Sequence, residues 1–339
     1  MAATHVNVLV TMPFGGALLD RMRAVSPRLG VRRADGAQAD YSDVDVLYGN
    51  TPPADLARAP KLAWVQLHMA GVNTLTDHPV FAAARVALTT TSGVHAHTVA
   101  EYALTALLAL AHRVPRMVEW RAKGGWPPDQ ERWPLFLPSE VRGATLGIIG
   151  YGSIGRELAR MAKSAFAMTV LACKRDPSQR ADTGYAAPGT GDPEGRLPDT
   201  WYAPDELHDM LRRSDAVVLA APLTRETERM IDARALAAMK PSAYFINVGR
   251  GGSVDEAALA RALTDGRIAG AAIDVFGEEP PPAGHPLYAL DVPHLILSPH
   301  VSGFLPTYDE RCTDLFAENL RRFLAGAPLL NLVDRAKGY

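Results

Sequence analysis

Three residues in the second half of the chain have side chains that could together bind a small anion and transfer a proton. They are Arg250, Glu279 and His300, and each follows closely on a short apolar run. A guanidinium group presents a fork of N–H donors that suits carboxylates. An imidazole ring gains and loses a proton near neutral pH, and a neighbouring carboxylate favours its charged form and fixes its orientation. We therefore predict that Arg250 binds an anionic substrate, that His300 is the general acid/base, and that Glu279 assists His300.

Each of these residues also has an ordinary interpretation. An arginine after a strand is usually a surface charge, a glutamate before a proline is usually solvated, and a lone histidine is usually structural. The functional interpretation gains weight because all three come after a glycine-rich dinucleotide motif, in an order that places each at a strand end. In α/β folds, ligands bind at the carboxyl ends of strands.

The glycine-rich motif is Gly150-Tyr151-Gly152-Ser153-Ile154-Gly155, a GxGxxG sequence. An apolar run at 145–149 leads into it and a helical pattern at 156–165 follows, which is the context that dinucleotide binding requires. Gly150 would permit the tight turn, Gly152 a close approach of a pyrophosphate, and Gly155 close packing of helix and strand. The helix N-terminus would then face the phosphates. A glycine-rich turn that binds nothing is the alternative.

The end of the next strand bears on the choice of cofactor. An acidic residue usually stands there and binds the adenosine ribose of NAD. Here Lys174 occupies that position, followed by Arg175 and Asp176. The two cations favour a 2′-phosphate, so we predict that NADP is preferred and that NAD is possible. A solvated pair of charges, or a shifted register in which Asp176 is the acid, is the alternative.

The elements that position these residues form two βα series. The residues expected in strands are 6–11, 44–48, 62–67, 145–149, 170–172, 216–220, 244–248, 271–275 and 295–297. A long buried helix is expected from Thr98 to His112, capped by Thr98 or His97. Alternating strands and helices predict parallel sheets covered on both faces. The fold class is therefore α/β, with two Rossmann-like domains and the nucleotide-binding domain inserted in the substrate domain.

The expected domains are 1–102 with 300–339 for substrate and 103–299 for the dinucleotide. A contiguous division near residue 140 is the simpler alternative. Two segments are rich in glycine and proline. Residues 123–138 are expected to form a loop, and residues 188–198 are expected to be an exposed insertion that alters only the surface.

Composition excludes several classes of protein. There are 35 lysines and arginines against 37 aspartates and glutamates, a net charge of −2, which gives no footprint for nucleic acid or an anionic membrane. The two cysteines, in no CxxC pattern, predict no metal site and a reducing compartment. The longest apolar run is too short to cross a bilayer. The start of the chain does not resemble a signal peptide, so we expect a cytoplasmic protein.

The chain resembles the D-isomer-specific 2-hydroxyacid dehydrogenase family, particularly its glyoxylate/hydroxypyruvate reductase branch. The matching motifs are GIIGYGSIG at 147–155, NVGRGGSVD at 247–255, GAAIDVFGEEP at 270–280 and SPHVSG at 298–303, with shorter matches at 98–102, 222–224 and 239–241. The resemblance implies an NAD(P)-dependent enzyme that interconverts a small 2-oxo acid and its D-2-hydroxy acid, and a homodimer. Lys174 and the 188–198 stretch depart from the family pattern.

The resemblance also implies further site residues. Cofactor contacts are expected from Gly150, Gly152, Ser153, Ile154, Gly155, Lys174, Arg175, Pro222, Thr227, Val248, Gly249, Asp274 and Thr98. Substrate contacts are expected from Arg250, from His68, Ala70 and Gly71 in an early loop, and from Trp133, whose segment resembles a loop that reaches a neighbouring subunit's site. For Trp133, packing in a dimer interface is the alternative.

Two other functions remain open at this stage. One is a formate or phosphite dehydrogenase on the same scaffold, in which Arg250 would bind the anion but no carbonyl would be reduced. The Glu279–His300 pair argues against a formate dehydrogenase, because the resemblance implies an Asn and a Gln in the active site of that branch. The other is an NAD(H)-sensing corepressor without enzymatic activity.

Overall fold

The computed structural model describes residues 5–36, 38–292 and 294–339. The chain divides into two compact units. The first comprises the residues up to His95, Thr183–Ala187 and Leu305–Tyr339, and the second comprises Ala96–Asp182 and Pro188–Phe304. No helix in these described ranges has the length and apolarity that a membrane crossing requires.

The first unit contains a five-stranded parallel sheet in the order β2-β1-β3-β4-β5. Its strands are β1 (Val6–Val10), β2 (Leu29–Arg33), β3 (Val46–Tyr48), β4 (Trp64–Gln66) and β5 (Ala87–Thr89). Its helices are α1 (Gly16–Arg23), η1 (Leu56–Arg58), η2 (Asn73–Leu75), α2 (Pro79–Ala82) and α10 (Tyr308–Ala325). The strands are largely buried, and Trp64, Tyr48 and Phe316 form the aromatic centre of one core cluster.

The second unit contains a seven-stranded parallel sheet in the order β12-β11-β10-β9-β6-β7-β8. Its strands are β6 (Thr145–Ile149), β7 (Thr169–Cys173), β8 (Thr200–Tyr202), β9 (Ala216–Leu219), β10 (Tyr244–Asn247), β11 (Gly270–Ile273) and β12 (Leu295–Leu297). The strand order reverses between β6 and β9, the kind of switch point at which doubly wound sheets bind ligands. The α/β fold class with two parallel sheets is thus confirmed.

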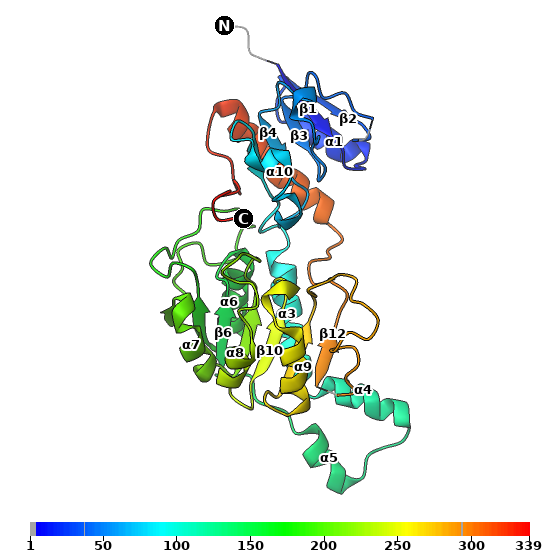
Figure 1. Ribbon diagram of the computed structural model, residues 1–339, viewed down its shortest axis with the longest axis vertical. Helices are drawn as coiled ribbons and strands as arrows, with labels where there is room; N and C mark the ends of the chain where they lie inside the picture. Colours follow the sequence, from blue (N-terminus) through cyan, green and yellow to red (C-terminus); the bar gives the residue numbers. More distant parts are fainter. Residues whose placement is uncertain (1–4, 37, 293) are drawn as a thin grey trace. The chain divides into compact units, whose positions relative to one another are not determined.

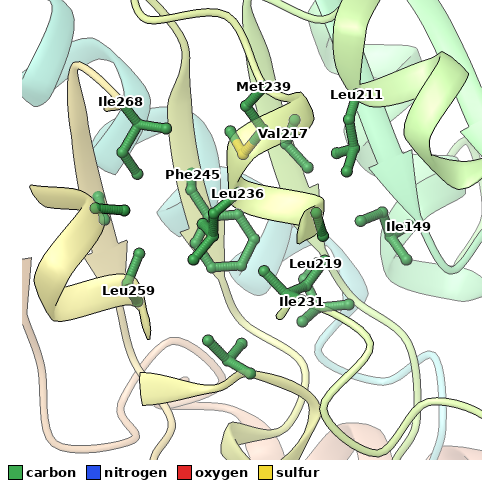
Figure 2. Close-up of a cluster of buried hydrophobic side chains, with 14 of the residues drawn as sticks. Ile149, Leu211, Val217, Leu219, Ile231, Leu236, Met239, Phe245, Leu259 and Ile268 are labelled. Atoms are coloured by element: carbon green, nitrogen blue, oxygen red, sulfur yellow. The ribbon is translucent and has the colours of Figure 1, made fainter. Parts of the chain in front are cut away.

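Helices cover both faces of the second sheet (Figure 1). The helices of this unit are α3 (Ala96–Ala111), α4 (Val114–Lys123), α5 (Asp129–Phe136), α6 (Ser153–Phe166), η3 (Pro204–Glu206), α7 (Leu207–Arg213), α8 (Ala233–Ala238), η4 (Gly251–Ser253) and α9 (Glu256–Thr264). Figure 2 shows one of the two resulting cores, in which Phe245 of β10 lies among apolar side chains from the neighbouring strands, α7, α8 and α9. This packing holds the strand ends, and the loops that follow them, in fixed positions.

Several expectations from the sequence need correction. Residues 123–138 are not a continuous loop, because α5 forms within them. Asp129 and Glu131 lie in its first turn, where acidic side chains stabilise the positive end of a helix. Helix α3 begins at Ala96, so Thr98 lies inside its first turn rather than at its cap, and its hydroxyl contacts His97 Nε2 at 3.2 Å.

Residues 174–199, between β7 and β8, are not merely a surface loop. Asp192 in this segment is only 7% exposed, and it accepts hydrogen bonds from the side chain of Tyr151 and from backbone N–H groups. Residues 183–187 of the same segment belong to the first unit, where the backbone N–H of Tyr185 donates to Asn331 Oδ1 at 2.9 Å. The sequence expectation was wrong because glycine and proline content does not reveal such long-range partners.

Candidate active site

The glycine-rich turn lies at the carboxyl end of β6, next to the switch point. Gly150 has φ +93°, and a Cβ there would lie 2.6 Å from the backbone of Ala221, which follows β9. A Cβ at Gly155 would lie 2.5 Å from the carbonyl oxygen of Gly150, whereas a Cβ at Gly152 would meet nothing. Two positions therefore need glycine for packing, and the third leaves open space beside the N-terminus of α6. This arrangement fits a dinucleotide pyrophosphate.

Other predicted cofactor residues also lie at this edge of the sheet. Ser153 and Ile154 begin α6, Pro222 follows β9, and Val248 and Gly249 follow β10. The hydroxyl of Thr227 donates to the carbonyl oxygen of Pro222 at 2.7 Å and accepts from the N–H of Thr224 at 2.8 Å, which closes the loop after β9.

The structure brings Glu279 and His300 into direct contact. His300 Nδ1 lies 2.7 Å from Glu279 Oε2, and the other carboxylate oxygen of Glu279 accepts from the N–H of Phe276 at 2.9 Å. Both side chains are partly open to solvent, His300 at 50% and Glu279 at 37% exposure. Glu279 therefore fixes the orientation of the ring through Nδ1, and Nε2 lies on the opposite edge of the imidazole.

Arg250 belongs to the same cluster. Its Nη1 donates to the carbonyl oxygen of Gly249 at 2.7 Å. Burial lowers the pKa of its guanidinium, and the charge of Glu279 partly opposes this effect. An arginine keeps its charge despite such a shift, so a positive charge is held in a desolvated place beside the Glu279–His300 pair.

Glycine at position 251 allows these loops to approach each other. A Cβ on Gly251 would lie 1.8 Å from the carbonyl carbon of Phe276, a distance that no packing tolerates. The loop that carries Arg250 and the loop that carries Glu279 are thus in backbone contact. Glu256 supports the second loop further, because its carboxylate accepts from the N–H of Gly277 at 2.9 Å and contacts His285 Nε2 at 3.0 Å.

Asp274, predicted as a cofactor contact, organises the loop that carries His300. Its fully buried carboxylate accepts from Ser298 Oγ at 2.6 Å and from the N–H groups of Val301 and Ser302 at 2.9 and 3.0 Å. Its carbonyl oxygen accepts from the N–H of His300, whose φ of +53° is left-handed. Ser298 and Tyr102, whose hydroxyl groups are hydrogen-bonded to each other, also support this loop and were not predicted as site residues.

Lys174 and Arg175 follow β7 directly. Lys174 Nζ donates to the carbonyl oxygen of Gln179, and Arg175 lies 3.5 Å from Glu226. Asp176 accepts from both the N–H and the hydroxyl of Ser178, and the hydroxyl hydrogen bond is the larger cause of the lowered pKa of this carboxyl group. The carboxylate of Asp176 is therefore engaged within its own turn.

Trp133 does not lie with these residues. It is 73% exposed on α5, and α4 and α5 leave the sheet at the opposite, amino-terminal edge. The chain returns from these two helices at Ser139, whose N–H donates to Ala111 O at the end of α3 and whose hydroxyl contacts Tyr244 at the start of β10. Within one chain, Trp133 is thus separated from Arg250 and His300 by the length of the strands.

His68, Ala70 and Gly71 belong to the first unit. Both ring nitrogens of His68 are engaged there, Nδ1 with Tyr48 Oη at 2.9 Å and Nε2 with Asp309 Oδ1 at 3.1 Å. The N–H of His68 donates to Asn50 Oδ1 at 2.8 Å. These contacts hold the start of the loop that continues through Ala70 and Gly71.

A pH dependence of stability follows from His68. Burial lowers its pKa, although Asp309 opposes the shift. The unfolded state then binds more protons than the folded state below the ordinary histidine pKa of about 6.5, so this contribution to stability is present above that pH and is lost as pH falls. We expect the thermal midpoint to fall from pH 7.5 to pH 5 and to fall less in His68→Gln. An equal slope in both proteins would contradict this. Burial also lowers the pKa of His294. His294 therefore accounts for part of the pH dependence of the thermal midpoint that remains in His68→Gln.

The doubly wound sheet and the glycine-rich turn together define a dinucleotide-binding α/β protein. The NAD-binding domain of D-isomer-specific 2-hydroxyacid dehydrogenases matches residues 104–302. A glyoxylate reductase of Pyrococcus furiosus is 36% identical over 284 residues, which cover 82% of this chain and 77% of the relative. A glycerate dehydrogenase of Methylorubrum extorquens is 35% identical over 236 residues, covering 68% and 67%.

A solved structure shows the same relationship over nearly the whole chain. It is a D-isomer-specific 2-hydroxyacid dehydrogenase from Xanthobacter autotrophicus in complex with NADPH and MES. The TM-score is 0.79 at 29% identity, and the match covers 99% of this chain and 100% of that one. The chain belongs to the D-isomer-specific 2-hydroxyacid dehydrogenase family. It is an NAD(P)-dependent enzyme that interconverts 2-oxo and 2-hydroxy acids.

Proposed function

We propose that this enzyme reduces a small 2-oxo acid to the D-2-hydroxy acid with Arg250, Glu279 and His300 as its catalytic residues. The observation that supports this most strongly is the 2.7 Å contact between His300 and Glu279 next to the desolvated Arg250. The relatives named glyoxylate reductase and glycerate dehydrogenase point to small 2-oxo acids such as glyoxylate and hydroxypyruvate. We assign dinucleotide binding to the unit of Ala96–Asp182 and Pro188–Phe304, close to the expected 103–299, and substrate binding to the other unit, close to the expected 1–102 with 300–339.

Each side chain has a defined task in this mechanism. Arg250 binds the substrate carboxylate and the adjacent carbonyl oxygen through its fork of donors. The nicotinamide, when bound, supplies the hydride to the carbonyl carbon. His300 gives the proton on Nε2 to the oxygen that becomes the hydroxyl, while Glu279 holds Nδ1 and stabilises the charged ring. In the oxidative direction neutral His300 takes that proton back. Ala70 and Gly71, whose loop His68 holds at its start, remain the substrate contacts predicted from the first unit.

The test is a panel of 2-oxo acids assayed with both reduced cofactors. We expect the enzyme to oxidise the reduced cofactor in the presence of glyoxylate, hydroxypyruvate or phenylpyruvate. Chiral analysis of the products of hydroxypyruvate and phenylpyruvate should give the D-isomer, whereas glycolate, the product of glyoxylate, is achiral. Binding of reduced cofactor without turnover of any oxo acid would contradict the proposal and favour a cofactor-sensing protein.

NADPH is the proposed preferred cofactor. A carboxylate after the second Rossmann strand binds the ribose of NAD and repels the phosphate of NADP. Here Lys174 and Arg175 stand at this position, and Asp176 is hydrogen-bonded to Ser178. Lys174 must leave the Gln179 carbonyl to reach a phosphate, and its flexible chain permits this.

We expect Lys174→Asp to move the cofactor preference toward NADH. One charge-assisted hydrogen bond is worth about 1.5–3 kcal/mol, which corresponds to roughly tenfold or more in affinity. The measurement is kcat/KM for each cofactor at a fixed oxo acid. The control is Lys61→Asp, which changes the net charge by the same amount at an exposed site in the first unit. It should leave the ratio of kcat/KM for NADPH to kcat/KM for NADH unchanged. A wild-type preference for NADH, or a ratio that Lys174→Asp does not shift, would contradict the assignment.

The protein is further proposed to act as a cytoplasmic homodimer. Helices α4 and α5 have no buried residues, and the segment exposes large apolar side chains at Val114, Met117, Val118, Trp126, Trp133 and Leu137. Val114, Met117 and Val118 share one face of α4 because of their i, i+3, i+4 spacing. An exposed apolar surface of this kind is typical of a protein interface, and a second copy is the proposed partner.

Two substitutions separate the parts of this proposal. Val118→Asp, which places a charge in the apolar face, should convert a dimer to a monomer in a measurement of mass in solution. Trp133→Ala should keep the dimer but raise KM for the oxo acid, since Trp133 is proposed to close the partner's substrate pocket. Unchanged KM for every substrate would exclude the pocket role and leave Trp133 as an interface residue.

A further inference from the structure

The segment between β7 and β8 makes a buried polar network with the glycine-rich turn. Tyr151, the residue between Gly150 and Gly152, is 2% exposed, and its hydroxyl donates to Asp192 Oδ2 at 2.8 Å. The carboxylate of Asp192 also accepts from the N–H groups of Arg196 and Leu197, both at 2.9 Å. The position of Asp192 is thus fixed by its own loop, and Asp192 in turn fixes the Tyr151 ring.

The first turns of α6 complete the network. Arg156 is 3% exposed, and its guanidinium donates to the carbonyl oxygens of Asp192 and Arg180 and lies 3.2 Å from Asp182. It also lies over the Tyr151 ring, 5.1 Å from the ring centroid. The segment after β7 is therefore bonded both to the turn and to the helix that follows it.

Glu157 is the second charged residue that this segment covers. It is 1% exposed, and its carboxylate accepts from the N–H of Gly191 at 2.6 Å and from Arg160. Burial alone would raise its pKa, but these hydrogen bonds lower it below its usual value. Arginine and glutamate are rarely buried unless they are paired. Arg156 and Glu157 can lie buried beneath this segment because most of their partners come from residues 180–182 and 191–197.

We propose that this segment is a cofactor-positioning element, which acts through Asp192 and Tyr151 on the backbone of Gly150–Gly152. The proposal rests on the turn's role in binding the dinucleotide. The pyrophosphate is common to NADH and NADPH, so loosening the turn weakens both cofactors by the same factor. Replacing a positioning residue, Tyr151 or Asp192, should therefore leave the ratio of the NADPH and NADH affinities unchanged. Replacing Lys174 should change that ratio.

The test uses Tyr151→Phe, which removes only the hydroxyl that donates to Asp192. Dissociation constants for NADPH and NADH are measured by the fluorescence of the reduced cofactor, together with kcat at saturating cofactor. We expect both constants to rise by the same factor, about 3- to 10-fold as one hydrogen bond allows, with kcat within about twofold of wild type. In the cofactor-free protein, amide hydrogen exchange of the peptide spanning the glycine-rich turn should become faster.

Tyr244→Phe is the matched control. Tyr244 is 3% exposed, and its hydroxyl contacts Ser139 Oγ at 2.9 Å at the opposite edge of the same sheet. It should leave both dissociation constants and the exchange of the turn unchanged, whatever its effect on thermal stability. Asp192→Asn, which keeps the shape of the side chain but removes its charge, serves as a second variant should Tyr151→Phe fold poorly. Unchanged cofactor binding in the folded variant, or equal weakening in Tyr244→Phe, would overturn the proposal.

Discussion

Replacing Arg250 with lysine should lower kcat/KM for the 2-oxo acid by roughly 10- to 100-fold. Lysine keeps the charge but cannot present two parallel donors to a carboxylate and the adjacent carbonyl. Loss of one charge-assisted hydrogen bond costs about 1.5–3 kcal/mol, and each 1.4 kcal/mol is a factor of about ten. The loss in kcat/KM should be near the upper end of this range because Arg250 is partly buried, and burial lowers the pKa of its guanidinium.

The measurement is steady-state kinetics on the oxo acid, with cofactor binding measured separately. The dissociation constant of the reduced cofactor should stay close to that of wild type. Arg234→Lys makes the same exchange at an exposed position on α8 and should have no effect on either quantity. Near wild-type kinetics in Arg250→Lys would remove Arg250 from the substrate site.

Removing the imidazole of His300 should cost still more. Proton transfer by a positioned side chain contributes about 10²- to 10⁴-fold, so we expect kcat to fall by that range with cofactor affinity intact. Asparagine is the better replacement than alanine here, because His300 has φ +53° and asparagine tolerates left-handed backbone. A loss of activity in His300→Asn can therefore be attributed to the missing proton donor and not to a distorted loop.

Glu279→Gln is the companion variant for this experiment. Glutamine retains an acceptor for the N–H of Phe276 but loses the charge that faces His300. Its kcat should fall less than that of His300→Asn, and the double variant should be no worse than His300→Asn alone because the two residues act as a unit. Additive losses would indicate that Glu279 acts separately from His300.

Local sequence patterns predicted the strands that carry the active site. The apolar runs at β6 and β12 had the bounds that the structure has, and the runs at β9, β10 and β11 were placed within two residues. A strand buried on both faces forms a continuous apolar run, which is a strong strand signal when turn residues bound it. The residues that follow these strands, Arg250 and His300 among them, were placed at the correct sheet edge for the same reason.

The elements that were missed or only partly predicted have weaker local signals. Strands β2, β5 and β8 all lie at sheet edges, where burial imposes less of an apolar pattern, and β5 and β8 have only three residues each. The sequence of β2 also includes Gly30, Arg32 and Arg33, so it does not form a continuous apolar run. The Tyr151–Asp192 hydrogen bond joins residues 41 positions apart, and no pattern within a single segment indicates such a partner.

The backbone contact at Gly251 has a consequence for altering this enzyme by directed evolution. Any side chain at position 251 would push the Arg250 loop away from the loop of Phe276 and Glu279, so random libraries should return only glycine there among active clones. At the next position a Cβ on Gly252 would lie 3.0 Å from its nearest neighbour, the flexible end of Leu223, and that side chain can move aside. A search for new substrate preference would thus gain from leaving codon 251 fixed and randomising codons 252 and 223 instead.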